Sequence, residues 1–152
     1  MTSIFDQIKQ DHDTIRRLLD EAEKADGDPR AAYEDLQREL WAHGKIEEAV
    51  FYQSLSKAKN TKQETTEGLN EHHIINGFLD ELNAMPADST AWKAKLQVLG
   101  EVTRHHLDEE EEELFEEAKK ALDDTRAEEL GGIYAERKKQ MLAALAPLPK
   151  SA

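Results

Sequence analysis

The chain has 152 residues, and its 20 lysines and arginines against 33 aspartates and glutamates give a formal net charge of −13. This length is typical of one domain, and this charge disfavours binding to nucleic acid or to anionic membranes, because both depend on basic patches. The sequence has no cysteine, which excludes disulfides, thiolate nucleophiles, iron–sulfur clusters and cysteine-type zinc sites, so any metal site must use His and carboxylate side chains.

The N-terminal segment predicts an amphipathic helix over residues 3–25. Two acids and no apolar run among the first eleven residues argue against a secretory signal, so we expect a cytoplasmic protein. The segment Asp-Gly-Asp-Pro at 26–29 ends this helix. The residues on one face of this helix follow a 3-4-3-4-3 spacing: Phe5, Ile8, His12, Ile15, Leu19 and Ala22.

A second helix is predicted from Arg30 to Lys59, with Leu36, Leu40, His43, Glu47 and Val50 on one face. Thr61 and Glu64 have the spacing of a capping box, so we expect them to open a third helix. That helix is predicted to stop at Met85, because Pro86 disfavours a helical residue before it. Its apolar stripe consists of Leu69, His72, Ile75, Leu79 and Leu82.

A fourth helix is predicted over residues 91–122, after a turn with capping residues at 87–90. A fifth helix is predicted over 125–145, opened by a capping box of Thr125 and Glu128. No segment alternates convincingly with period two, so we expect no strand.

Short connections between long helices favour antiparallel neighbours. The sequence therefore predicts an all-α fold, an up-down-up-down antiparallel four-helix bundle with an extra C-terminal helix. We expect one domain over residues 1–146, whose four-helix core spans 3–122, followed by a tail over 147–152.

All six histidines lie on the four long predicted helices: His12, His43, His72 with His73, and His105 with His106. A single His on an apolar face is usually a packed core residue, but its recurrence on every long helix indicates a shared site. His12 and His43 each lie 13 residues from the end of their helix at the shared turn, or roughly 20 Å at 1.5 Å per residue. By the same count His72 and His106 are level to within about one turn.

An internal repeat joins the two halves of the chain. His43 and His106 are each followed by Glu at +4, Glu at +5 and large apolar residues at +8 and +9. A His and a Glu four residues apart point the same way from a helix, so His43 with Glu47 and His106 with Glu110 can each reach one point in the core.

Burying these polar groups without compensation would be very costly, and bound cations are the simplest compensation. Nitrogen-rich ligation with bridging carboxylates suits iron, although zinc, manganese and cobalt accept similar ligands. A ferritin-like di-metal site requires Glu-x-x-His, and this spacing does not occur in the sequence.

The order His, His-x3-Glu, His, His-x3-Glu resembles the hemerythrin-like, or HHE cation-binding, family over residues 3–120, and the segment HHLDEEEEELF at 105–115 is especially similar to the family's fourth-helix motif. The resemblance implies two non-heme iron ions joined by an oxo or hydroxo bridge inside the bundle. It implies His12, His43, His72 and His106 as terminal ligands and Glu47 and Glu110 as bridging ligands.

One position departs from the family pattern. Oxygen-carrying hemerythrins have a second His one turn after the third-helix ligand, and Asn76 stands at that place, which weakens the interpretation as an oxygen carrier. His73 or His105 could fill the gap, and Glu111 could replace Glu110 as a ligand.

The resemblance implies a protein that binds or processes oxygen, nitric oxide or peroxide at the iron pair, with an unknown redox partner. Two alternatives remain open: iron storage or donation, and an acidic interaction module that is stabilised by metal but has no redox activity.

Overall fold

The computed structural model describes residues 2–25, 29–87 and 89–145, and within them every regular element is helical. The expected helices are present, which confirms the all-α bundle with an extra C-terminal helix. The elements are α1 (Ile4–Lys24), α2 (Arg30–Ile46), η1 (Glu47–Tyr52), η2 (Lys59–Thr61), α3 (Lys62–Asn83), α4 (Thr90–Glu109), η3 (Glu110–Leu114), α5 (Phe115–Ala121) and α6 (Asp124–Ala144).

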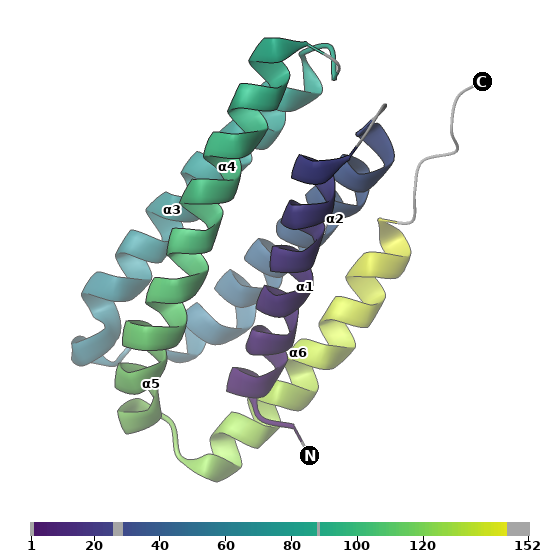
Figure 1. Cartoon of the computed structure of the whole chain (residues 1–152). Coiled ribbons are helices and arrows are strands. Elements are labelled where there is room, and N and C mark those ends of the chain that lie inside the picture. The colour runs from purple at the N-terminus through teal and green to yellow at the C-terminus, as the bar shows by residue number, and fades with distance from the viewer. Residues whose placement is uncertain (1, 26–28, 88, 146–152) are drawn as a thin grey trace.

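Figure 1 shows two helix pairs, α1 with α2 and α3 with α4, and the last helix alongside the first pair. The two pairs meet through contacts of α1 with α4 and of α2 with α3. Helix α6 packs on α1, α2 and η1, so it covers the outer side of one pair only. No helix among the described residues is both long and apolar enough to cross a membrane.

Two capping predictions are wrong. Thr61 makes no side-chain cap on α3, because its hydroxyl donates instead to the carbonyls of Leu55 and Ala58. Helix α6 begins at Asp124, one residue before the predicted start, because the Asp123 carboxylate accepts from the Arg126 N–H and is the N-cap. An Asp is at least as good an N-cap as a Thr, so the earlier position prevails.

Other boundaries agree with the predictions to within a few residues. The predicted second helix ends earlier than expected, since the helical backbone that continues from α2 through η1 stops at Ser54 and turns begin at Leu55. Ser89 caps α4 by accepting from the Trp92 N–H, which confirms a cap in the predicted turn. Most of the predicted break at 26–29, and the predicted tail at 147–152, lie outside the described residues.

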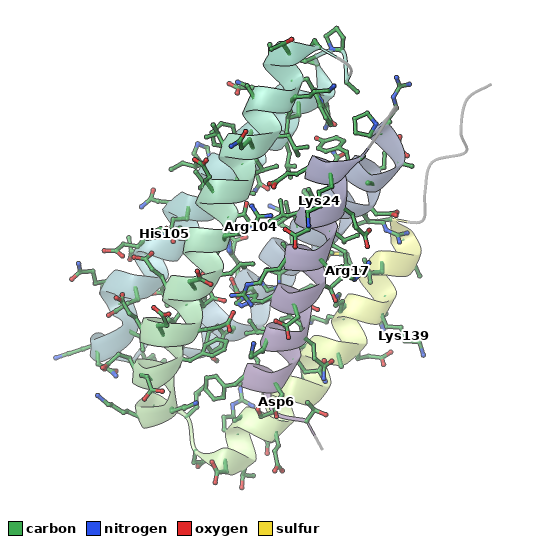
Figure 2. The ribbon with its side chains drawn as sticks, viewed as in Figure 1. Asp6, Arg17, Lys24, Arg104, His105 and Lys139 are labelled. Carbon is green, nitrogen blue, oxygen red and sulfur yellow. The ribbon has the colours of Figure 1, made fainter. Side chains whose placement is uncertain are left out.

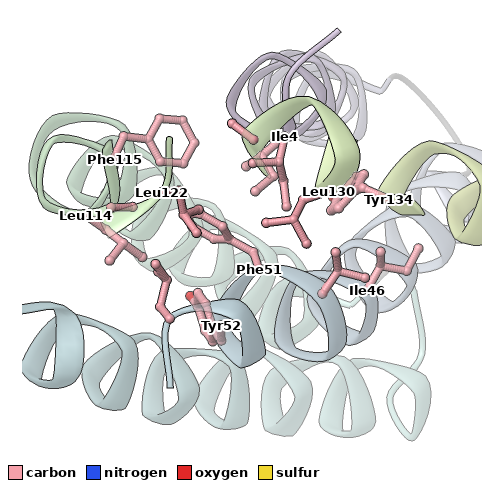
Figure 3. Packing of buried hydrophobic residues seen from close by; sticks show 14 of the residues in the cluster. Ile4, Ile46, Phe51, Tyr52, Leu114, Phe115, Leu122, Leu130 and Tyr134 are labelled. Carbon is pink, nitrogen blue, oxygen red and sulfur yellow. The ribbon is translucent and has the colours of Figure 1, made fainter. Parts of the chain in front are cut away.

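The apolar core consists of two clusters that lie above and below a layer of histidines. One cluster joins α1, the end of α2, η1, η3, α5 and α6, and Figure 3 shows Phe51 at its centre among Ile4, Leu122 and Leu130. The other joins the far halves of α1 to α4. Leu69 was expected in the apolar stripe of α3, but it is 45% exposed, and Gly68 is buried against Tyr52 instead.

Candidate metal centre

Four buried histidines, one from each helix of the two pairs, form the layer between the apolar clusters. The rings of His12 and His43 have centroids 5.1 Å apart, and those of His72 and His106 are 4.8 Å apart. The expectation that each pair lies level is confirmed. Their relative exposures are between 0% and 5%, so the site is enclosed by the bundle.

The six predicted ligands fall into two groups of donor atoms that share one carboxylate. His12, His43, Glu47 and Glu110 can each offer an atom within 4.8 Å of the others, and so can Glu47, His72 and His106. The structure thus brings all six residues together, while their ligation of a metal stays a prediction. The two groups meet at Glu47, which belongs to both.

Each glutamate presents its two oxygens to different histidines. Glu47 Oε2 lies 3.3 Å from His43 Nε2, and Glu47 Oε1 lies 3.1 Å from His72 Nε2. Glu110 Oε1 lies 3.2 Å from His12 Nε2, and Glu110 Oε2 lies 3.7 Å from His106 Nε2. Both carboxylates are therefore oriented to join the two halves of the site.

Both glutamates begin a π-helical segment. Glu47 is the first residue of η1 and Glu110 the first residue of η3, where the backbone widens from the preceding α-helix. Single π-helical turns occur frequently at functional sites, because they shift the direction of a side chain relative to a regular helix. The sequence offered no signal for these segments.

The buried donor atoms are short of partners. His12 Nε2, His43 Nε2, both oxygens of Glu47 and Glu110 Oε1 have no hydrogen-bond partner. Buried polar atoms are nearly always hydrogen-bonded, so a convergent set without partners is a sign that another group completes the site. Imidazole and carboxylate donors in this number fit divalent transition metals.

The opposite edges of the imidazoles are held by carboxylates. His12 Nδ1 lies 2.8 Å from Glu111 Oε2, and His106 Nδ1 lies 2.7 Å from Glu71 Oε1. His43 Nδ1 lies 3.0 Å from Asp11 Oδ2. Since an ionised carboxylate only accepts, Nδ1–H donates in each case and the Nε2 lone pair is left for a metal.

The contacts between carboxylates and Nδ1 atoms repeat the internal symmetry of the sequence. Asp11 directly precedes His12 and Glu71 directly precedes His72, and each accepts from the buried His of the neighbouring helix, His43 and His106 respectively. The aromatic rings at +9 from His43 and His106 also match, since Tyr52 stacks on His72 and Phe115 stacks on His12. The sequence analysis did not identify Asp11 and Glu71, although each stands one residue before a buried His, which was a usable signal.

The symmetry is broken by α6. The Tyr134 hydroxyl donates to Asp11 Oδ2 and lies 2.8 Å from His43 Nδ1, and Lys138 Nζ donates to Asp11 Oδ1. Helix α6 therefore supports this site through Tyr134 and Lys138. No spacing in the sequence connects Tyr134 or Lys138 with the histidines.

The charged groups of the site shift one another's pKa values. Burial alone would lower the pKa of His43, but the Glu47 and Asp11 carboxylates raise it well above its ordinary value. Burial also opposes the shift at His106, where the nearby Glu47 and Glu71 carboxylates raise the pKa to about 10. Burial would raise the pKa of Glu47, but His43 and other donors hold it well below its ordinary value. Without a metal, protons on His43 and His106 thus compensate the carboxylates, and a bound cation would displace them.

The alternative ligand residues lie outside the two central groups. His73 is exposed, and His105 is exposed at the surface of α4, where Figure 2 shows it on the side of α3. Glu111 contacts His12 at Nδ1, the edge that faces away from the other donors, and it also pairs with Lys9 and Arg16. Burial would raise the pKa of Glu111, but His12 and Arg16 lower it to about 2.

A small cavity adjoins the second donor group. His43, His72 and His106 line it together with Leu40, Gly44, Ile75, Asn76, Thr103 and Leu107. Thr103 is fully buried, and its hydroxyl has no hydrogen-bond partner. Asn76, the residue that departs from the family pattern, therefore lies at the wall of a cavity beside the histidines.

Comparison with known proteins agrees with the geometry. A family model described as the hemerythrin HHE cation binding domain matches residues 3–118. A solved structure of a hemerythrin HHE cation binding domain-containing protein from Mycobacterium kansasii is 25% identical, with a TM-score of 0.82 over 95% of this chain and 90% of that one. A DNA nickase from Nostoc sp. is 25% identical over 116 residues, which are 74% of this chain and 32% of the nickase, so the chain spans about a third of that relative.

Proposed function

This chain belongs to the hemerythrin HHE cation-binding family, and we propose that its buried His and Glu side chains hold two non-heme iron ions. The observation that carries the proposal is the pair of donor groups joined at Glu47. His12 and His43 would hold one ion, His72 and His106 the other, and Glu47 and Glu110 would contact both. The contacts of each carboxylate with histidines of both halves support this assignment.

The two halves offer different numbers of donors. The first group contains four residues and the second three, because Glu110 falls only in the first group. Asn76 stands where a further His would add a donor to the second group. Glu110 Oε2 also accepts a hydrogen bond of 2.8 Å from the Tyr52 hydroxyl, which reduces its availability to the second group. An exchangeable ligand would therefore bind at the half formed by His72 and His106.

We infer that this ligand is a small molecule, namely oxygen, nitric oxide or peroxide. A bound iron pair would supply reversible electron transfer to such a ligand. The cavity beside His72 is small, and Leu40, Ile75 and Leu107 form the apolar part of its wall, which suits a small molecule rather than a larger substrate. The free Thr103 hydroxyl is placed to hydrogen-bond a polar occupant of this cavity.

The relative that is called a DNA nickase does not change this proposal. The shared region covers 32% of that protein, and this chain carries a net charge of −13, which opposes contact with a phosphate backbone. We therefore propose no nucleic-acid activity for this chain.

The proposal is tested by loading metal-free protein with ferrous iron in the absence of oxygen. Oxygen, nitric oxide and peroxide are then added separately while the absorption spectrum is followed. We expect at least one of them to change the iron spectrum. Thr103→Val, which keeps the side-chain shape, should leave the iron content unchanged and alter the rate of ligand release. An iron-loaded protein whose spectrum responds to none of the three would contradict the proposed ligand chemistry.

A further inference from the structure

We propose that a cleft between α3 and the α4–η3 helix is the route by which divalent cations reach the buried donor atoms, and that Glu71, His105 and Glu109 hold the cation at its mouth. This inference rests on the proposed function, since it concerns the supply of metal to that site. The central histidines are at most 5% exposed, so a metal ion needs a path through the bundle.

The cleft is lined by six glutamates, five in its walls and one in its floor, and it ends at the centre. Its walls carry Glu64, Glu67 and Glu71 from α3, and Glu109 and Glu113 from the opposite helix. Its floor is formed by Tyr52, His106 and Glu110. The acids on α3 recur every three to four residues, which places them on one face of the helix.

A group of potential ligands lies at the edge of the cleft, where Glu71 and Glu109 line it and His105 lies beside them on α4. Glu71, His105 and Glu109 each offer an atom within 4.8 Å of the others, and His105 Nε2 lies 3.3 Å from Glu109 Oε1. His105 is exposed at the outer surface beside α3 (Figure 2). One imidazole and two carboxylates suit a divalent transition cation, and the exposure of this group makes it suited to brief rather than permanent binding.

Buried atoms at the floor connect the mouth to the centre. Glu110 is 3% exposed and lines the cleft, and its oxygen without a hydrogen-bond partner, Oε1, lies 3.2 Å from His12 Nε2 in the first donor group. Glu71 belongs to the mouth group, yet its Oε1 lies 2.7 Å from His106 Nδ1. A cation at the mouth is therefore separated from the central donors by one layer of side chains.

The charge around the site differs between its two sides. On the α1 side, Lys138 neutralises Asp11, and Lys9 and Arg16 neutralise Glu111. In the cleft, none of the five wall glutamates forms an ion pair with a lysine or arginine of the described residues. Unneutralised carboxylates that line a cleft concentrate cations in it, so metal ions should approach from this side.

The test measures the rate at which metal-free protein takes up Co²⁺, followed by its visible absorption as the ion becomes coordinated. His105→Asn with Glu109→Gln removes two of the mouth ligands. The matched control, His73→Asn with Glu112→Gln, makes the same two changes at exposed positions outside the cleft. We expect the mouth variant to load about ten-fold more slowly at low ionic strength. The control should load at the wild-type rate, and all three proteins should reach the same final number of bound ions.

The outcomes separate this inference from the proposed function. If the wild-type chain loads its central site and the mouth variant loads equally fast, the route is wrong while the proposed site stands. A wild-type chain that takes up no tightly bound ion overturns both. A slower variant with the same final occupancy supports the route.

Discussion

Tyr134 allows the contribution of the C-terminal helix to the metal centre to be measured. Its side chain is fully buried, and its hydroxyl donates to Asp11 and contacts His43 Nδ1. Tyr134→Phe removes this hydroxyl and keeps the ring in the apolar core. Asp11 then retains Lys138 and His43 as donors, so the change weakens the support of His43 without leaving a charge unpaired.

Two magnitudes follow for this variant. A hydrogen bond to a charged group contributes about 1.5–3 kcal/mol, so we expect the free energy of unfolding to fall by about 2 kcal/mol. For a domain of this length, this corresponds to a decrease in Tm of roughly 4–8 °C. Loss of a residue that orients a metal-binding His typically weakens metal affinity by about 10–100-fold, and we expect a decrease in this range.

The assay combines thermal unfolding of the metal-free protein with competition for iron against a chelator. Tyr33→Phe is the matched control, because the Tyr33 hydroxyl donates to the Leu79 carbonyl and to Asn83 in the other apolar cluster. It should lower stability by about 1 kcal/mol and leave iron affinity unchanged. If Tyr134→Phe competes for iron as well as the wild type does, then α6 does not support the centre and the reasoning is refuted.

Three further predictions concern packing and charge. Gly68→Ala should destabilise the protein by about 1–3 kcal/mol in urea unfolding, because the added Cβ would overlap the Tyr52 side chain. Gly77→Ala should instead stabilise α3 by about 0.5–1 kcal/mol, because its added Cβ would meet no atom within 4 Å. Equal effects of the two substitutions would contradict the packing at Tyr52. Phe51→Ala should cost about 3–5 kcal/mol in calorimetry, since the side chain is fully buried, and a loss below about 1 kcal/mol would contradict its central place in the core. In the metal-free protein, charged His106 has a raised pKa of about 10, so its stabilising contribution is complete below its ordinary value of 6.5 and is lost as the pH rises through about 10. The stability difference between wild type and His106→Gln should therefore shrink from neutral pH to above pH 10, and a difference that does not change would contradict the ionisation assigned to His106.

The helices and the histidine layer could be predicted from the sequence because they follow from periodicity. Apolar residues at 3-4 spacing fix which face of each helix is buried, and equal distances from a turn fix which residues are level. These rules placed His12 beside His43 and His72 beside His106. They failed at Leu69, since the close approach of Tyr52 to Gly68 turns the neighbouring position of α3 toward solvent.

Other features depend on contacts that a single sequence does not reveal. The π-helical turns at Glu47 and Glu110 have no local sequence signature. The contacts of Tyr134 and Lys138 with Asp11 depend on how α6 docks on the bundle, which its own composition does not specify. The cap at Asp123 shows a similar limit, because neighbouring residues were also chemically able to cap the helix.

The proposed centre holds two iron ions per chain in the layer formed by the four buried histidines. The most direct test is elemental analysis of protein purified without chelator or imidazole, with iron supplied during expression. The account predicts close to two irons per chain and the loss of most of that iron in Glu47→Ala, because Glu47 is shared by both donor groups. Zinc alone, no metal, or an iron content that Glu47→Ala leaves unchanged would contradict it.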